Sequence, residues 1–269
     1  METKFVQTIG GSTDTFNNPL EICLFGKLHQ KYGKPLFLWK KACYNIHENT
    51  ELFNYMESWC DEMANVRDAV NAVITAIMAQ KDYLTAVDAK TGDGDHGLNM
   101  ARGFTAAEER LAELPADAPV GEVLHHIGRA FIENVGGAAG PLYGIAFVRA
   151  GEAVNDKTRL DVYSFEKLFT AGIDAIQRRG RAVRGDKTML DTLIPIRDAF
   201  RAENADGKSL RECLEDALNA GRAGAEYTKT IAARRGRAAL IGARSIGIED
   251  PGAMSSLIMF RALCSYLRG

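Results

Sequence analysis

Apolar residues recur with helical spacing over most of this 269-residue chain. The clearest stripe consists of Val120, Val123, Leu124, Ile127 and Phe131, which are positions i, i+3, i+4, i+7 and i+11 of one helix face. Strict period-two alternation, which is typical of strands, is absent after about residue 50. The pattern predicts an all-α fold of about seven to nine helices from about residue 52 onward. Four further stripes have this spacing, within residues 66–77, 165–176, 210–217 and 257–264.

Alanine and aromatic residues divide the chain into two parts. Only Ala42 of the 37 alanines lies in the first fifty residues, which hold seven of the 22 aromatic residues. The remainder is rich in good helix formers. We therefore expect residues 1–50 to be an N-terminal extension of unknown role and 51–269 to be a helical domain. Within the extension, residues 19–25 and 34–40 fit either short strands or a hydrophobic arm.

Charge and cysteine content exclude several classes of protein. Thirty-three Lys and Arg against 35 Asp and Glu leave no basic excess for electrostatic nucleic-acid binding. No run of eighteen apolar residues or signal-peptide pattern is present, so we expect no membrane association and a cytoplasmic location. The five cysteines are scattered without CxxC spacing, which predicts reduced thiols and argues against a disulfide framework or a zinc site.

Three aspartates stand close together in the segment Val87-Asp-Ala-Lys-Thr-Gly-Asp-Gly-Asp-His-Gly-Leu-Asn-Met100. The intervening glycines allow sharp turns that would aim Asp88, Asp93 and Asp95 at one point. Mg²⁺ prefers such carboxylates together with phosphate and water oxygens. The structural alternative is a turn whose carboxylates cap the helix that follows. The ligand spacing of an EF-hand is missing.

A second glycine-rich junction, Asn134-Val-Gly-Gly-Ala-Ala-Gly-Pro-Leu-Tyr-Gly144, directly follows the clearest stripe. Its glycines and Pro141 indicate a tight loop that leads into a helix N-terminus. Free backbone N–H groups and the helix dipole make such a place receptive to phosphate. A helix C-cap followed by an N-cap, without any ligand, explains the pattern equally well.

Three later junctions are also open to two interpretations. Residues 185–191 (GDKTMLD) do not have Walker A spacing, so Thr188 could simply cap a helix and Lys187 could be a solvated charge. Arg237, directly after a glycine, is suited to bind a phosphate bidentately, although most arginines are solvated. Asp250 and Pro251 predict the N-cap and first position of the last helix. Together, the junctions contain the parts of a magnesium–nucleotide site.

Four segments, in this order, also resemble a known family: GDGDHGLNM (92–100), GGAAGPLYG (136–144), GDKTMLDTLIP (185–195) and GRAALIGARSIGIEDPGA (236–253). They are similar to the nucleotide-binding L subunit, or L domain, of dihydroxyacetone kinases. The resemblance covers roughly residues 60–269. It implies a barrel of about eight antiparallel helices that holds a nucleotide, ADP or ATP, at one end.

The resemblance also implies a role for individual residues. The aspartates Asp88, Asp93 and Asp95 would hold two Mg²⁺ ions that bridge the nucleotide phosphates. The phosphate loop would be residues 136–140, and Arg237 would support the phosphates. The full set of nucleotide-binding residues expected on these grounds is His96, Gly97, Leu98, Asn99, Gly137, Ala138, Ala139, Gly185, Thr188, Met189, Arg237, Asp250, Pro251 and Gly252.

The implied reaction is phosphoryl transfer by positioning and charge neutralisation, with no catalytic residue assigned on this chain. Dihydroxyacetone or a related ketose would be bound by a partner K subunit. The donor would be either exchangeable ATP or bound ADP that a multiphosphoryl protein of the phosphotransferase system rephosphorylates, and the resemblance implies a homodimer. The alternative is a non-catalytic nucleotide-binding protein that signals kinase status to a transcriptional regulator.

Two positions depart from the family pattern. The phosphate loop of the family usually carries a hydroxyl residue where this chain has Ala138 and Ala139. Losing a hydroxyl contact to a phosphate costs on the order of 1–3 kcal/mol, although the backbone N–H groups remain. This departure motivates the regulatory alternative. At the second position, Ile248 stands where many relatives carry His.

Overall fold

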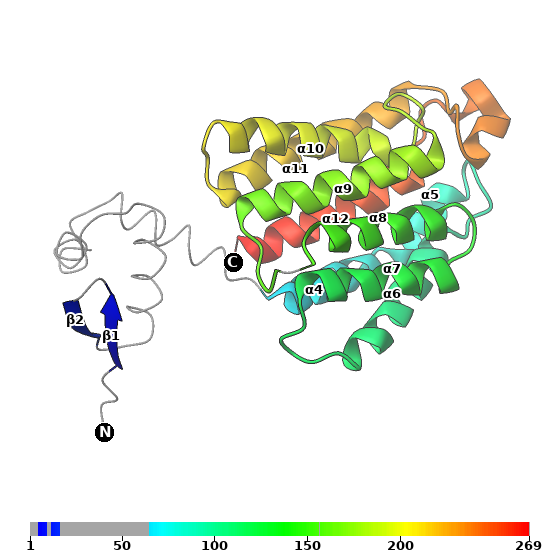
Figure 1. Ribbon diagram of the computed structural model, residues 1–269. Helices are drawn as coiled ribbons and strands as arrows, with labels where there is room; N and C mark the ends of the chain where they lie inside the picture. Colours follow the sequence, from blue (N-terminus) through cyan, green and yellow to red (C-terminus); the bar gives the residue numbers. More distant parts are fainter. Residues whose placement is uncertain (1–4, 10–11, 17–64, 156, 269) are drawn as a thin grey trace. The chain divides into compact units, whose positions relative to one another are not determined.

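The computed structural model describes residues 5–9, 12–16, 65–155 and 157–268 (Figure 1). The chain forms two compact units, Met1–Glu57 and Ser58–Gly269. In the first unit, strands β1 (Phe5–Ile9) and β2 (Ser12–Phe16) pair antiparallel, with Phe5 opposite Phe16. The expected boundary at residues 50–51 and the apolar runs 19–25 and 34–40 lie outside the described residues.

The described part of the second unit is helical, so the predicted all-α class is confirmed. All five apolar stripes fall on helices, namely α4, α7, α9, α11 and α12. The nine α-helices and two 3₁₀ segments described here are α4 (Val66–Ala79), α5 (Lys81–Asp88), α6 (His96–Ala112), α7 (Val120–Asn134), α8 (Ala139–Ala153), α9 (Val162–Gly180), α10 (Leu190–Ala205), α11 (Leu210–Tyr227), η2 (Thr228–Thr230), η3 (Arg237–Ser245) and α12 (Pro251–Leu267).

The helices form a closed barrel. Each one from α6 to α12 packs on its neighbours in sequence, and α12 returns to pack on both α4 and α5. Because α4 and α5 meet end to end at Gln80, they form one wall of the barrel. Figure 1 shows the helices side by side, with their axes close to one common direction. The expected barrel of about eight helices is confirmed.

Polar side chains begin several helices where the sequence places cap residues. Asn65 caps α4, and Asp161 caps α9 by accepting from the N–H of Ser164 at 2.7 Å. Ser209 and Glu212 form a reciprocal capping box at α11. The predicted start of the last helix is confirmed, since Asp250 accepts from the N–H of Ala253 at 2.7 Å and Pro251 follows the cap.

The barrel core contains two clusters of buried apolar side chains. Edge-to-face packing of Phe104 on Phe131, with centroids 4.9 Å apart, lies in the larger cluster. The smaller cluster includes Phe165 and the buried thiols Cys213 and Cys264, which are free cysteines as predicted. None of the helices in the described residues is long and apolar enough to cross a membrane.

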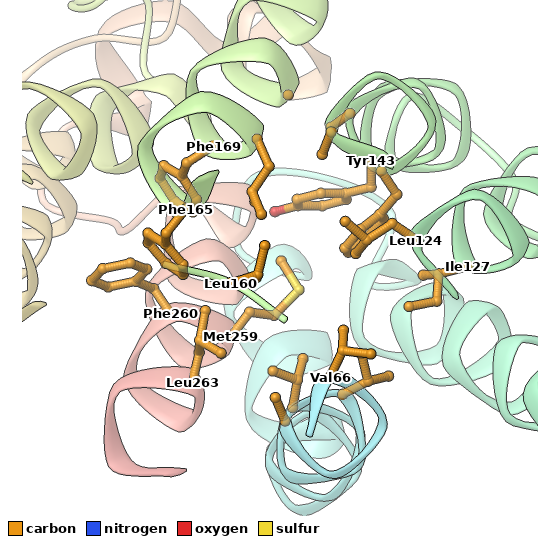
Figure 2. Close-up of a pocket in the computed structure, with 18 of the residues that line it drawn as sticks. Val66, Leu124, Ile127, Tyr143, Leu160, Phe165, Phe169, Met259, Phe260 and Leu263 are labelled. Atoms are coloured by element: carbon orange, nitrogen blue, oxygen red, sulfur yellow. The ribbon is translucent and has the colours of Figure 1, made fainter. Parts of the chain in front are cut away.

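An apolar cavity of about 200 Å³ remains between the helices. Figure 2 shows Leu124, Phe169, Met259 and other apolar side chains around it, with the Tyr143 hydroxyl among them. None of the residues lining this cavity carries a charge. A nucleotide phosphate would have no ionic partner there, so the candidate functional site must lie elsewhere.

Candidate functional site

The three predicted aspartates converge at the junction of α5 and α6. Asp88 ends α5, Asp95 precedes α6, and Asp93 lies in the loop between them. One carboxylate oxygen from each lies within 4.8 Å of the others. Gly94 makes the turn possible with a φ of +71°, a value that other residues rarely adopt.

Asp88 has a second task in this loop. Its Oδ2 accepts from the backbone N–H of Asp95 at 3.0 Å and of His96 at 3.2 Å. The buried carboxylate therefore satisfies N–H groups at the start of α6, which is the capping role considered from the sequence. Capping uses only one of its two oxygens, so Asp88 can cap the helix and still present an oxygen to a cation.

The aspartate cluster fits a hard divalent cation such as Mg²⁺. All the ligand atoms of the cluster are carboxylate oxygens, which Mg²⁺ prefers. Asp93 also attracts a positive group in this structure, since Arg237 Nη1 lies 2.7 Å from Asp93 Oδ2. Three carboxylates this close repel one another, and a cation bound between them would relieve that repulsion. The cluster therefore suits a metal that also binds phosphate.

A cavity of about 410 Å³ lies beside this cluster. Its wall combines the aspartates with the glycine loop before α8, the start of α10, the segment before η3 and the start of α12. Residues far apart in the sequence thus meet at one end of the barrel. The expected site residues that line it are Asp88, Asp93, Asp95, His96, Asn99, Gly137, Ala138, Ala139, Thr188, Met189, Arg237, Asp250, Pro251 and Gly252.

The glycine loop delivers the N-terminus of α8 to this cavity. Gly137 adopts a φ of +65°, and no side chain caps the first turn of the helix. A Cβ at Gly140 would lie 2.1 Å from the carbonyl oxygen of Val135, so only glycine permits this tight turn. The first N–H groups of a helix have no partner within it, and they can bind an anion.

Three of the expected nucleotide-binding residues do not line the cavity. Gly97 is buried where α6 packs against α5, and the Leu98 side chain is 48% exposed. Gly185 has a φ of +95° and donates its N–H to Asp191 Oδ1 at 2.6 Å. In the structure Gly97 and Gly185 shape the backbone, and Leu98 faces solvent.

His96 lies at the inner wall of the cavity. Its Nε2 is 2.9 Å from Ser255 Oγ, which is in turn 2.8 Å from the hydroxyl of the buried Tyr143. Burial lowers the pKa of His96, whereas Asp88 and Asp95 oppose that shift. A ring held in this way is suited to orient a phosphate group by hydrogen bonding.

Asp250 is a second perturbed group. Burial raises its pKa to about 7, and Asp191 adds to the shift, while the N–H of Ala253 and the charge of Lys187 oppose it. An unfolded chain releases this proton near pH ~3.9. Between about pH 4 and 7 the folded protein therefore binds more protons than the unfolded one, and the free energy of unfolding must fall as pH rises.

Replacing Asp250→Asn should remove this pH dependence, because Asn remains a good N-cap but does not titrate. Urea unfolding followed by circular dichroism should show the variant gaining stability over the wild type between pH 4 and 8, by about 1–4 kcal/mol. Asp82→Asn, at a side chain that is 96% exposed, serves as the matched control. A constant difference across this range would contradict the raised pKa of Asp250.

A family model described as the DAK2 domain matches residues 90–265. The chain belongs to this family. It is 40% identical over 184 residues to the "PEP-dependent dihydroxyacetone kinase, ADP-binding subunit DhaL" of Escherichia coli (strain K12), an alignment that covers 68% of this chain and 87% of that protein. The "PTS-dependent dihydroxyacetone kinase, ADP-binding subunit DhaL" of Lactococcus lactis is 38% identical, over 70% of this chain and 88% of that protein.

A solved structure supports the same membership of the DAK2 family. The dihydroxyacetone kinase from C. freundii, in complex with AMP-PNP and Mg²⁺, matches with a TM-score of 0.59 and 28% identity. The match covers 74% of this chain but only 33% of that one. The resemblance stated from the four motifs is confirmed, and the relatives named here are kinases or kinase subunits.

Sequence reasoning missed several residues of the DAK2 chain that line the cavity. Pro141 directly follows the predicted phosphate loop (136–140), which itself contains the lining residue Gly136, and Gly180 follows the predicted helical stripe within residues 165–176. The interpretation of Lys187 as a solvated charge is wrong, because the structure buries it. No local signal marks Lys187, because its hydrogen-bond partners belong to residues that follow α10 and α11 in the sequence. The other missed lining residues are Thr91, Leu142, Ile176, Arg179, Ala182, Leu190, Arg235, Gly236 and Ala238.

Proposed function

We propose that this chain is the phosphoryl-donor subunit of a dihydroxyacetone-type kinase, which binds ADP or ATP with Mg²⁺ and serves a ketose held on a partner K-type subunit. The observation that carries the proposal is the meeting of three carboxylates and an uncapped helix N-terminus in one cavity. Carboxylates and phosphates are both negatively charged, so a metal ion must bind between them, whereas the N–H groups of a helix N-terminus can bind a phosphate directly.

Each group in the cavity would have a separate part in binding. Asp88, Asp93 and Asp95 would hold the magnesium, with two ions as the expected number. When bound, the metal neutralises phosphate charge and polarises the transferred group. The N–H groups at residues 136–140 would hold the phosphates, and Arg237 would turn from Asp93 towards them. No covalent intermediate on this chain is needed.

We propose bound ADP as the working form. The relatives from E. coli and L. lactis are both named ADP-binding subunits, and one name states PEP dependence and the other PTS dependence. Denaturing the purified protein and identifying the released nucleotide by mass spectrometry tests this. Stoichiometric ADP would support a resident cofactor that a phosphotransferase-system protein rephosphorylates. An empty protein that turns over free ATP would instead support the exchangeable donor.

A partner must cover the cavity, because a transferred phosphoryl group needs the acceptor hydroxyl in direct reach. Three exposed apolar side chains flank lining residues: Leu98, Val183 and Leu240, the last 86% exposed. We expect a K-type subunit to dock on the surface that carries these three side chains. Homodimerisation of the chain stays a separate prediction.

Leu240→Lys should therefore weaken partner binding and leave ADP binding unchanged. Burying one leucine contributes about 1.5–3 kcal/mol, so turnover at limiting partner concentration should fall roughly 10- to 100-fold. Tyr163→Lys is the control, since Tyr163 is 70% exposed on the first turn of α9, whereas the last turn of α9 lines the cavity. Equal effects of the two variants on turnover would place the docking surface elsewhere.

The proposed function as a whole is tested in two steps. Calorimetric titration of the protein with ADP and Mg²⁺ should show binding, and its absence at millimolar concentration would refute the proposal. Mixing the chain with a K-type subunit, a phosphoryl donor and a panel of small ketoses should then give turnover. Ala138 and Ala139 favour a second candidate, a regulatory nucleotide-binding protein. Binding without turnover with any donor would select it.

A further inference from the structure

Lys187 is buried in a way that its neighbours in sequence do not explain. Its side chain is 1% exposed, yet no carboxylate forms an ion pair with it among the described residues. Instead, Nζ lies within hydrogen-bond distance of four backbone carbonyl oxygens: Thr228 at 2.5 Å, Ile231 at 3.3 Å, Ser245 at 2.8 Å and Ile248 at 2.6 Å. A lysine has three N–H donors, so these acceptors occupy all of them.

All four carbonyl groups belong to residues 228–248, which we call the arginine loop because it carries Arg237. The loop contains neither an α-helix nor a strand. It contains the two 3₁₀ segments and three glycines at positive φ, Gly236, Gly242 and Gly247. Other bonds also cross the loop, namely Gly247 N–H to Lys229 O at 2.8 Å and Ala233 N–H to Ser245 Oγ at 2.9 Å. The ammonium group contacts the loop near both ends, at Thr228 and Ile231 and at Ser245 and Ile248, so its removal would loosen the place where the two ends are held together.

Lys187 occupies this position at an energetic cost. A lysine is rarely buried without a paired carboxylate, because a charge loses hydration there. Its φ of +63° lies in the left-handed region, which is unfavourable for a residue other than glycine. Such costs persist where the surroundings fix a group in one place. Here the surroundings are the four carbonyl groups of the arginine loop.

The same lysine also lines the candidate nucleotide cavity, as do Arg237 and Thr188. A second link joins the two segments, since Arg234 N–H donates to Asp186 O at 3.0 Å. The loop before α10 and the arginine loop are therefore fastened together at the wall of the cavity. The side chain of Arg237 is 61% exposed and contacts Asp93. Because an exposed side chain is held by few neighbours, the backbone of the arginine loop fixes the position from which it extends.

We propose that Lys187 is a positioning residue, whose ammonium group holds the arginine loop in the shape that brings Arg237 to the phosphate end of the cavity. The effect of Lys187 on nucleotide binding rests on the proposed function. The ordering of the arginine loop by Lys187 does not depend on it. Lys187 acts through Arg237 and need not touch the nucleotide.

Hydrogen exchange tests the ordering of the loop without any nucleotide. In Lys187→Met, amide exchange across residues 228–248 should be at least tenfold faster than in the wild type, with α7 and α8 unchanged. Lys167→Met, at an exposed lysine on α9, is the matched control and should leave exchange unaltered. Unchanged protection of the arginine loop in Lys187→Met would overturn the proposal.

A double-mutant cycle tests the action through Arg237. Lys187→Met and Arg237→Ala should each weaken ADP binding about tenfold, and the double variant should be no weaker than either alone. Independent effects, which multiply to about a hundredfold in the double variant, would overturn the positioning role. If the wild type binds no ADP, the proposed function fails while the exchange result still decides the ordering role.

Should Lys187→Met fail to fold, Lys187→Arg keeps a cation with several N–H donors in the same place. It should restore part of the protection of residues 228–248 relative to Lys187→Gln, which keeps fewer donors and no charge. Equal protection in the two variants would show that the ammonium charge does not order the loop.

Discussion

Replacing Asp93→Asn together with Asp95→Asn should abolish Mg²⁺-dependent binding of ADP. Both side chains contribute oxygens to the cluster that spans 4.8 Å, and an amide lacks the negative charge that attracts a divalent cation. Affinity should fall by about a hundredfold or more, equivalent to about 3 kcal/mol. Calorimetric titration with ADP at saturating Mg²⁺ measures the change.

The choice of aspartates makes this result interpretable. Asp88 is left intact because its Oδ2 holds the N–H groups of Asp95 and His96, so its loss would also disturb the start of α6. Asp82→Asn removes the same charge from an exposed position on α5 and should leave ADP binding unchanged. Retained affinity in the double variant with normal helical content would refute the metal assignment.

The helices of the barrel were predictable because their causes are local. The spacing of Val120 to Phe131 alone defines a buried face, and the structure buries these residues in α7. Asp250 followed by Pro251 likewise predicts the start of α12, since capping involves only residues within one turn. Closure of the ring depends on contacts between α12 and α4, almost two hundred residues apart, and only the family resemblance predicted it.

The candidate site was predictable to a similar extent. Asp88, Asp93 and Asp95 lie in one loop, so their convergence follows from the glycines between them. The position of Lys187 does not follow from its neighbours, because its partners begin forty-one residues further along the chain. A lysine in a polar segment is ordinarily solvated, and only the folded arginine loop supplies the carbonyl groups that bury it.

The N-terminal hairpin illustrates a local signal that was overlooked. β1 and β2 are separated in sequence by Gly10 and Gly11, and two glycines between short runs with strand-forming residues are typical of a β-hairpin. Composition averages over a segment, whereas a two-residue turn depends on two positions.

Gly97 gives the second large effect, and it concerns stability. It was expected to bind nucleotide, but it lies where α6 crosses α5, and a Cβ there would be 2.0 Å from Lys81 O and 2.5 Å from Thr85 Oγ1. Gly97→Ala should therefore force the two helices apart and cost about 3 kcal/mol. Thermal unfolding followed by circular dichroism should show a melting temperature lower by several degrees, with or without ADP.

Intrinsic helix propensity predicts the opposite sign, because alanine within a helix is favoured over glycine by about 1 kcal/mol. The measurement therefore decides between packing and propensity. Gly136→Ala is the control: its φ is not positive, and a Cβ would meet only Asn99 Oδ1 at 3.9 Å. The control should change stability by less than about 0.5 kcal/mol. An unchanged melting temperature of Gly97→Ala would contradict the close contact of α6 with Lys81 and Thr85 of α5. This contact matters for the site as well, because α5 ends at Asp88 and α6 begins at His96, on either side of the aspartate loop.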